Sequence, residues 1–102
     1  MHEEPRRRDC TEETPFDEGK TALLQQLHLT AQQFDEAYLE GFHASVGLNP
    51  ASGEQIVGSD LFIYITINAQ RFPSLRIGYT FDDTTIHLWH VDVNPAGNGQ
   101  EN

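Results

Sequence analysis

Residues 61–93 constrain the fold more than any other part of the chain, because most of the β-branched and aromatic side chains lie there. Two turn signals divide this segment. Asp83–Thr84 suits a two-residue hairpin turn, and Pro73 suits a loop at about 70–74, outside any strand ladder. The segment is therefore predicted to form a three-stranded antiparallel meander, with strands at about 61–69, 75–82 and 85–93.

The two loop lengths also predict which side chains share a face, because successive residues of a strand point to opposite faces of the sheet. One predicted face is apolar and forms the core, with His90 at its end as a hydrogen-bonded structural histidine. Its other members are Ile63, Ile65, Ile67, Ile77, Tyr79, Phe81, Ile86 and Leu88. A slip of one residue in either loop would invert this assignment.

Two helices are predicted before the sheet. Thr14 followed by Pro15 suits a helix start, and the helix is expected over about 15–28 with an apolar stripe of leucines. Thr30 and Gln33 form a capping box that opens a second helix over about 31–46. Aromatic residues recur in it at four-residue intervals, as in a buried helix face. The expected fold is α+β, with two N-terminal helices packed on one face of a three-stranded antiparallel β-meander.

The two ends of the chain are expected to be disordered, leaving a single α+β domain over 14–93. Residues 1–13 mix both charges and hold almost no apolar side chain, and residues 94–102 are also polar. In the meander, Leu61–Ile67 would be an uncharged edge strand, which invites pairing. Either Gln55–Val57 or residues 1–13, called here the leader, cover this edge, or the edge itself forms a homodimer or binds a partner by strand addition.

The chain is acidic, with a formal net charge of −10 over 102 residues. Such a charge repels phosphate backbones and anionic lipid, so direct binding to nucleic acid or to a membrane is not expected. A basic protein partner is favoured, although acidity can also serve solubility alone. The acidic surface is predicted to include Asp35, Glu36, Glu40, Asp82 and Asp83.

The single cysteine, Cys10, excludes an intrachain disulfide and is typical of a reducing compartment. The first twenty residues contain no apolar run of the kind found in signal peptides. The longest uncharged apolar run, Leu61–Ile67, is too short to span a bilayer. We therefore expect a cytoplasmic protein.

No motif in the sequence predicts catalysis, a cofactor or a metal site. His90 and Asp92 share a strand face and could act together on a proton, but two such groups are a weak signal. His87 lies three residues from His90 and points to the other face, so the two cannot chelate one metal. No phosphate-binding loop and no nucleophile pattern is present.

The second face of the predicted meander is the candidate interaction site. Trp89 is placed over Gly78, with Arg76 stacked diagonally upon it. Tryptophan, tyrosine and arginine clustered at the middle of a surface are typical of binding hot spots. The remaining members of this cluster are Tyr64, Phe62, His87 and Thr66. Alternatively, the first helix covers this face through Leu23, Leu24 and Leu27.

These observations favour a non-enzymatic protein that binds a basic, nucleic-acid-handling partner and inhibits it. Immunity proteins, antitoxins and phage anti-defence proteins share this size and acidity, and such a protein can mimic nucleic acid. One alternative is a self-associating structural or assembly subunit that uses the Leu61–Ile67 edge. Another is a small enzyme that depends on histidine and aspartate.

One segment of the chain resembles part of a known toxin family, which is relevant to the enzyme alternative. The segment LRIGYTFDDTTIHLWHV, residues 75–91, resembles the last hairpin of the RelE/ParE toxins and covers under a fifth of the chain. The resemblance implies a toxin that holds RNA or its target through basic residues. The chain departs from this pattern, since only Arg71 and Arg76 are basic in residues 21–102 and no strand is expected before the helices.

Overall fold

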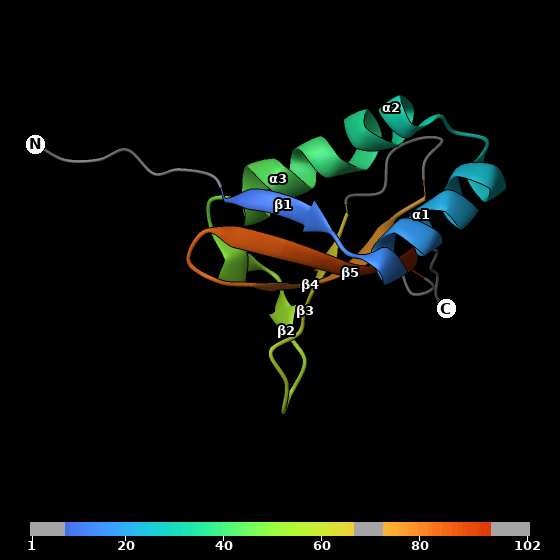
Figure 1. The fold of residues 1–102 in the computed structure, drawn as a ribbon. Helices are drawn as coiled ribbons and strands as arrows, with labels where there is room; N and C mark the ends of the chain where they lie inside the picture. Colours follow the sequence, from blue (N-terminus) through green and yellow to red (C-terminus); the bar gives the residue numbers. More distant parts are fainter. Residues whose placement is uncertain (1–7, 67–72, 95–102) are drawn as a thin grey trace, which may run out of the picture.

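The computed structural model describes residues 8–66 and 73–94. It shows a twisted five-stranded mixed sheet with α2 and α3 on one side, while the hairpin of β2 and β3 projects on the other (Figure 1). The strand order is β1-β5-β4-β3-β2. The strands are β1 (Asp9–Glu12), β2 (Glu54–Gln55), β3 (Phe62–Ile65), β4 (Leu75–Phe81) and β5 (Thr85–Val93). The α+β class is thus observed, but the predicted three-stranded antiparallel meander is wrong.

Strand β1 is the largest departure from the sequence-based expectation, because its residues fall in the leader that we expected to be disordered. It pairs in parallel with the first half of β5, from Asp9 opposite Thr85 to Glu12 opposite Leu88. The next amide, that of Glu13, donates to the Leu88 carbonyl at 2.9 Å. Main-chain hydrogen bonds therefore hold this polar strand, which has no apolar pattern to reveal it.

Strand β2 pairs with β3 at the opposite edge, so the expectation that a neighbouring segment covers this edge is partly met by Glu54–Gln55. The end of the predicted first strand, 67–69, and most of the predicted loop at 70–74 lie outside the described residues. The two-residue turn at Asp83–Thr84 is confirmed, because the Asp82 amide donates to the Thr85 carbonyl at 2.9 Å.

The two helices lie close to their predicted positions. The first is α1 (Thr14–Leu27), whose N-cap is Glu13 rather than the expected Thr14. The second comprises three consecutive segments, namely α2 (Ala31–Phe34), the π-helical η1 (Asp35–Leu39) and α3 (Glu40–Val46). The capping box of Thr30 and Gln33 is confirmed, with bonds of 2.9 and 3.1 Å.

The π-helical turn η1 explains how side chains at strict four-residue intervals keep one face. On a regular α-helix, each step of four residues rotates the side chain by about 40° around the axis. In the wider π turn each residue rotates less around the helix axis, which offsets this drift. The side chains at the four-residue interval therefore all stay buried, namely Phe34, Tyr38, Phe42 and Val46. The aromatic stripe therefore packs on the sheet as predicted, although the sequence did not predict the π turn.

The register of β3 against β4 differs from the predicted one by three residues. Phe62 lies opposite Tyr79 and Tyr64 opposite Ile77, so these two aromatic side chains face the helices. An odd shift exchanges the faces of a strand. Ile63 and Ile65, which we placed in the core, consequently point away from the helices.

A β-bulge in β5 separates two registers. Tyr79 pairs with Leu88 as predicted, but Gly78 pairs with His90, which leaves Trp89 as the extra residue. Beyond the bulge, Val91 lies opposite Ile77 and is buried, whereas His90 is exposed. The predicted place of His90 in the core is therefore wrong.

The core lies between the sheet and the helices. Phe16 and Leu23 of α1 pack in it, so α1 covers the helix side of β5 and not its other side. Gly19 allows a close approach, since a Cβ there would lie 3.1 Å from the Val91 carbonyl oxygen. The other buried apolar residues are Phe34, Tyr38, Phe42, Val46, Leu75, Ile77, Tyr79, Ile86, Leu88 and Val91.

The short 3-10 turn η2 (Pro50–Ser52) is fastened to the sheet by the fully buried Tyr79. The Tyr79 hydroxyl donates to the Pro50 carbonyl at 2.5 Å and accepts from the Gly53 amide at 3.1 Å. A buried hydroxyl needs such partners, because leaving them unpaired costs about 1–3 kcal/mol. This contact sets where the β2–β3 hairpin leaves the sheet.

Candidate protein-binding surface

The sheet face turned away from the helices, called here the open face, is where most of the candidate residues lie. It carries Ile63 and Ile65 of β3, Arg76 and Thr80 of β4, and His87, Trp89 and His90 of β5. None of the described helices packs on it, because the buried side chains of α1, α2 and α3 belong to the core on the other side. The alternative in which the first helix covers Trp89 is therefore wrong.

Trp89 is the large aromatic side chain of the open face, and 39% of its surface is exposed. Its indole nitrogen donates to the Thr80 hydroxyl at 2.9 Å, which fixes the ring across the strand pair. It does not stand over Gly78 as predicted. The neighbours of Gly78 are instead His90, Ile63 and Leu61, at 3.2–3.7 Å from the position of a Cβ.

Arg76 binds Asp92 rather than stacking on Trp89. Two guanidinium nitrogens donate to the two carboxylate oxygens at 3.1 and 2.8 Å. His90 adds a contact of 3.3 Å to the same carboxylate. Burial pulls the pKa of Asp92 upward, but the hydrogen bonds and charges of Arg76 and His90 outweigh it, so the pKa is lowered.

His87 bridges two carboxylates from different parts of the chain. Its Nδ1 lies 2.8 Å from Glu13 at the start of α1, and its Nε2 lies 3.4 Å from Asp82 in the β4–β5 turn. The hydrogen bond to Glu13, followed by that to Asp82, raises the pKa of His87. The protonated imidazole donates to both groups, so it clamps the β1–α1 junction to the turn.

Asp82 is held in its ionised form mainly by the turn itself. Its Oδ1 accepts from the amides of Thr84 and Thr85 at 2.9 and 2.8 Å. These bonds, with smaller help from His87, lower the pKa of Asp82 to about 2. The carboxylate is therefore charged at any physiological pH and available to His87.

The clamp predicts a pH dependence with a defined sign. An ordinary histidine has a pKa of about 6.5, and that of His87 is raised, so its stabilising contribution is complete below pH ~6.5 and is lost as pH rises through the raised value. The contribution of Asp82 is present above its ordinary pKa and is lost as pH falls toward about 2. NMR titration of the His87 ring should give a midpoint above ~6.5.

The variant Glu13→Gln is the matched test of this clamp, because it removes the main cause of the raised pKa and keeps the shape of the side chain. The midpoint of His87 should fall toward ~6.5 in this variant. An unchanged midpoint would contradict the clamp.

Three candidate residues lie elsewhere. Tyr64 meets the ring of Phe42 edge-on at 5.4 Å, and Phe62 stacks on Tyr79 at 5.7 Å, both toward the helices. Thr66 is buried, and its hydroxyl accepts from the Leu75 amide at 2.8 Å. These positions follow from the shifted register of β3, which also brought Ile63 and Ile65 to the open face. No sequence signal distinguishes the two registers.

The predicted acidic residues divide between the second helix and the β4–β5 turn. Asp35, Glu36 and Glu40 lie on the second helix, whereas Asp82 and Asp83 lie in the β4–β5 turn. The described residues include thirteen acidic and three basic side chains. A net charge of −10 is therefore carried by the described residues alone.

The three basic side chains of the described segments are all engaged within the chain. Arg8 donates to the Asp82 carbonyl at 2.8 Å and lies 6.0 Å from the ring of Phe81. Lys20 binds Glu12 at 3.1 Å, and Arg76 binds Asp92 at 2.8 Å. Within 8–66 and 73–94, each basic side chain therefore already has a bonding partner inside the chain.

The remaining features concern the thiol of Cys10, groups of metal-binding side chains and helices that could span a membrane. Desolvation, followed by the charges of Asp9 and Glu12, raises the pKa of Cys10 to about 11, so the thiol stays protonated at neutral pH. Among 8–66 and 73–94, no three histidine, cysteine or acidic side chains are grouped to hold a metal ion. No helix in these segments has the length and apolar character needed to cross a membrane.

No model of a known protein family, no curated protein and no solved structure matches this chain. The resemblance of residues 75–91 to the RelE/ParE hairpin therefore stands on that segment alone. One departure from that family was wrongly expected, because β1 does precede the helices. The other departure is the scarcity of basic residues. The described residues contain only three basic side chains, and each of them is bound within the chain.

Proposed function

We propose that this chain is an acidic, non-enzymatic binding protein whose partner is a basic protein that handles nucleic acid. The observation that carries the proposal is the combination of ten unbalanced acidic groups with three basic side chains that are all bound internally. Such a surface attracts cationic proteins and repels phosphates. An inhibitor of the immunity, antitoxin or phage anti-defence type would act by occupying a surface meant for nucleic acid.

The open face supplies the apolar contact that such a complex needs. Trp89 is exposed and held in one orientation by Thr80, and Ile65 is 44% exposed on the same face. Beside them, a hollow of about 380 Å³ is lined by Asp60, Phe62, Thr80, Phe81, Asp82 and His87. An exposed tryptophan beside a recess with acidic walls has the composition of a binding hot spot.

The proposal predicts capture of a basic partner that is sensitive both to salt and to Trp89. Immobilised protein should retain a nucleic-acid-handling protein from a lysate of the source organism at low salt and release it at high salt, because salt screens the charges. With the captured protein purified, Trp89→Ala should weaken binding by at least ~30-fold, the effect of a hot-spot residue of about 2 kcal/mol.

Leu48→Ala is the matched control, because Leu48 is also an exposed apolar side chain, 46% accessible, but follows α3 and lies away from the open face. It should bind the partner like the wild type. Equal affinity of the Trp89→Ala variant would contradict a role for the open face. A stable dimer in a sizing experiment with no captured partner would instead support the self-assembling alternative.

A further inference from the structure

A groove lies between the edge strand β1 and the second helix, on the side of the sheet opposite to Trp89. Its volume is about 250 Å³, smaller than the ~300–1,000 Å³ of sites for drug-sized ligands. The floor is apolar, formed by Leu39, Phe42 and Leu88. The walls carry Cys10 and Glu12 from β1, and Asp35, Glu40 and His43 from the helix. A groove of this size accommodates one long side chain.

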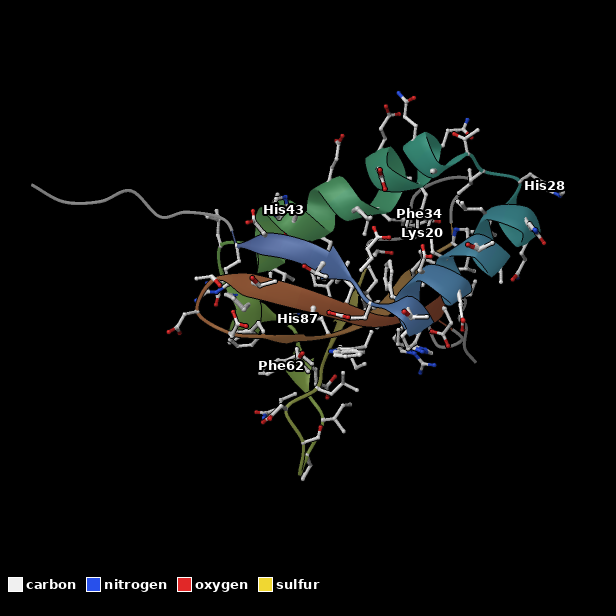
Figure 2. All side chains as sticks on the ribbon, in the orientation of Figure 1. Lys20, His28, Phe34, His43, Phe62 and His87 are labelled. Atoms are coloured by element: carbon white, nitrogen blue, oxygen red, sulfur yellow. The ribbon has the colours of Figure 1, made fainter. Side chains whose placement is uncertain are left out.

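Near His43, the chain that leads into β1 is bonded to the end of the second helix. The Arg8 amide donates to the Gly47 carbonyl at 3.0 Å, and the ring of His43 bonds the Arg8 carbonyl at 2.9 Å. Figure 2 shows His43 on α3 above β1. These two contacts tie the strand to the end of the helix, so the walls of the groove are set without any ligand.

The π-helical turn decides which side chains line the helix wall. On a regular α-helix, residues five apart point about 140° away from each other. Here the Glu40 amide bonds the Asp35 carbonyl in the wide π turn, which brings Asp35, Leu39 and Glu40 to the same side. Turns of this kind occur frequently at functional sites. The wall therefore joins two carboxylates to an apolar side chain.

Lys20 of α1 shows the chemistry that this region accepts. Its ammonium group lies 3.1 Å from Glu12, 4.0 Å from Asp35 and 5.6 Å from the centre of the Phe34 ring (Figure 2). The side chain is only 14% exposed. A long cation thus already lies between β1 and the second helix, with its ammonium group close to two carboxylates and an aromatic ring. No basic side chain of residues 8–66 or 73–94 pairs with Glu40, which also lines the groove.

We infer that this groove binds an arginine side chain presented by the basic partner, an inference that rests on the function proposed above. The apolar stem of arginine would cover Leu39, Phe42 and Leu88. Its planar guanidinium has five donors, so it can bond Glu40 on the helix wall, while the Glu12 carboxylate, whose two oxygens already accept from Lys20, lies on the other wall. The lysine ammonium is more compact and more strongly hydrated than the guanidinium, so we expect a lysine side chain to bind an apolar groove more weakly.

The probe is the blocked peptide acetyl-Gly-Arg-Gly-amide, titrated into the ¹⁵N-labelled protein and followed by NMR. Shifts should concentrate on the amides of β1 and of residues 35–43, with an affinity on the order of millimolar for a single side chain. The citrulline peptide keeps the shape of arginine without its charge and should cause no such shifts. The lysine peptide should bind several-fold more weakly than the arginine peptide.

Two variants, each of which removes one negative charge, distinguish binding in the groove from general attraction to an acidic surface. Glu40→Gln should weaken the arginine peptide about tenfold, whereas Asp83→Asn, in the β4–β5 turn, should leave its affinity unchanged. Equal weakening by both variants, or shifts spread over the open face, would overturn the inference.

The failure of this inference can be told apart from that of the proposed function. Capture of a basic partner that depends on Trp89 but not on Glu40, with no groove shifts from the peptide, overturns the groove alone. Groove shifts that depend on Glu40 without any captured partner support arginine binding and remove the proposed function.

Discussion

Replacing Gly53 by alanine is expected to lower the free energy of unfolding by about 3 kcal/mol. A Cβ at this position would lie 2.6 Å from the Tyr79 hydroxyl and 2.8 Å from the Ile63 carbonyl oxygen. Neither atom can move freely, because the hydroxyl also bonds Pro50 and the carbonyl belongs to β3. Urea denaturation should show the loss, and the melting temperature should fall by about 15 °C in a domain of this size.

Gly41→Ala provides the matched control. Gly41 lies in α3, and nothing approaches within 4 Å of the position that its Cβ would take. Alanine should therefore stabilise the helix by up to about 1 kcal/mol. If the two variants had equal stability, the close packing of Gly53 against Tyr79 would be refuted. The double variant Gly53→Ala with Tyr79→Phe should lose less than the sum of its single changes, because the phenylalanine removes the nearer of the two clashing atoms.

Replacing Phe42 by alanine is expected to cost about 3–5 kcal/mol, a large part of the ~5–15 kcal/mol that stabilises a typical domain. Phe42 is 1% exposed. Its ring meets those of Tyr64 and Tyr79 edge-on, at 5.4 and 5.5 Å between centroids. The alanine variant leaves a cavity where the second helix meets the sheet. Thermal unfolding followed by circular dichroism measures the effect.

The leucine variant at the same position keeps most of the buried volume and should cost about 1–1.5 kcal/mol. A small effect of Phe42→Ala, no larger than that of the leucine variant, would mean that the second helix is not packed on the sheet through this ring. Phe42 also forms part of the groove floor. The Phe42→Ala variant should therefore lose the proposed binding of arginine even where it remains folded.

The parts of the fold that could be predicted from the sequence are those encoded by local signals. Thr30 and Gln33 mark a helix start because both bonds of a capping box form within four residues. Asp83–Thr84 marks the β4–β5 hairpin because a two-residue turn fixes the adjacent pairing. The four-residue spacing of aromatic side chains identified the buried face of the second helix.

The parts that escaped prediction depend on contacts that are distant in sequence or made by the main chain. β1 has no apolar pattern, and its place is set by hydrogen bonds to β5. The bulge at Trp89 moves His90 out of the core and Val91 into it, and no residue type marks it in the sequence. The β3 register reversed the roles of Ile63 and Phe62. As a result, the candidate surface kept Trp89, Arg76 and His87 but exchanged its other members.

The pairing of β1 with β5 also determines when the groove between β1 and the second helix can form. These strands are separated by more than seventy residues, so their contact closes a long loop. Contacts of this kind slow folding, because chain entropy is lost before they form. During synthesis, residues 9–12 emerge before β5 and have no partner strand until β5 leaves the ribosome. The groove, with β1 as one wall, therefore exists only after the sheet is complete, so a nascent chain lacks it.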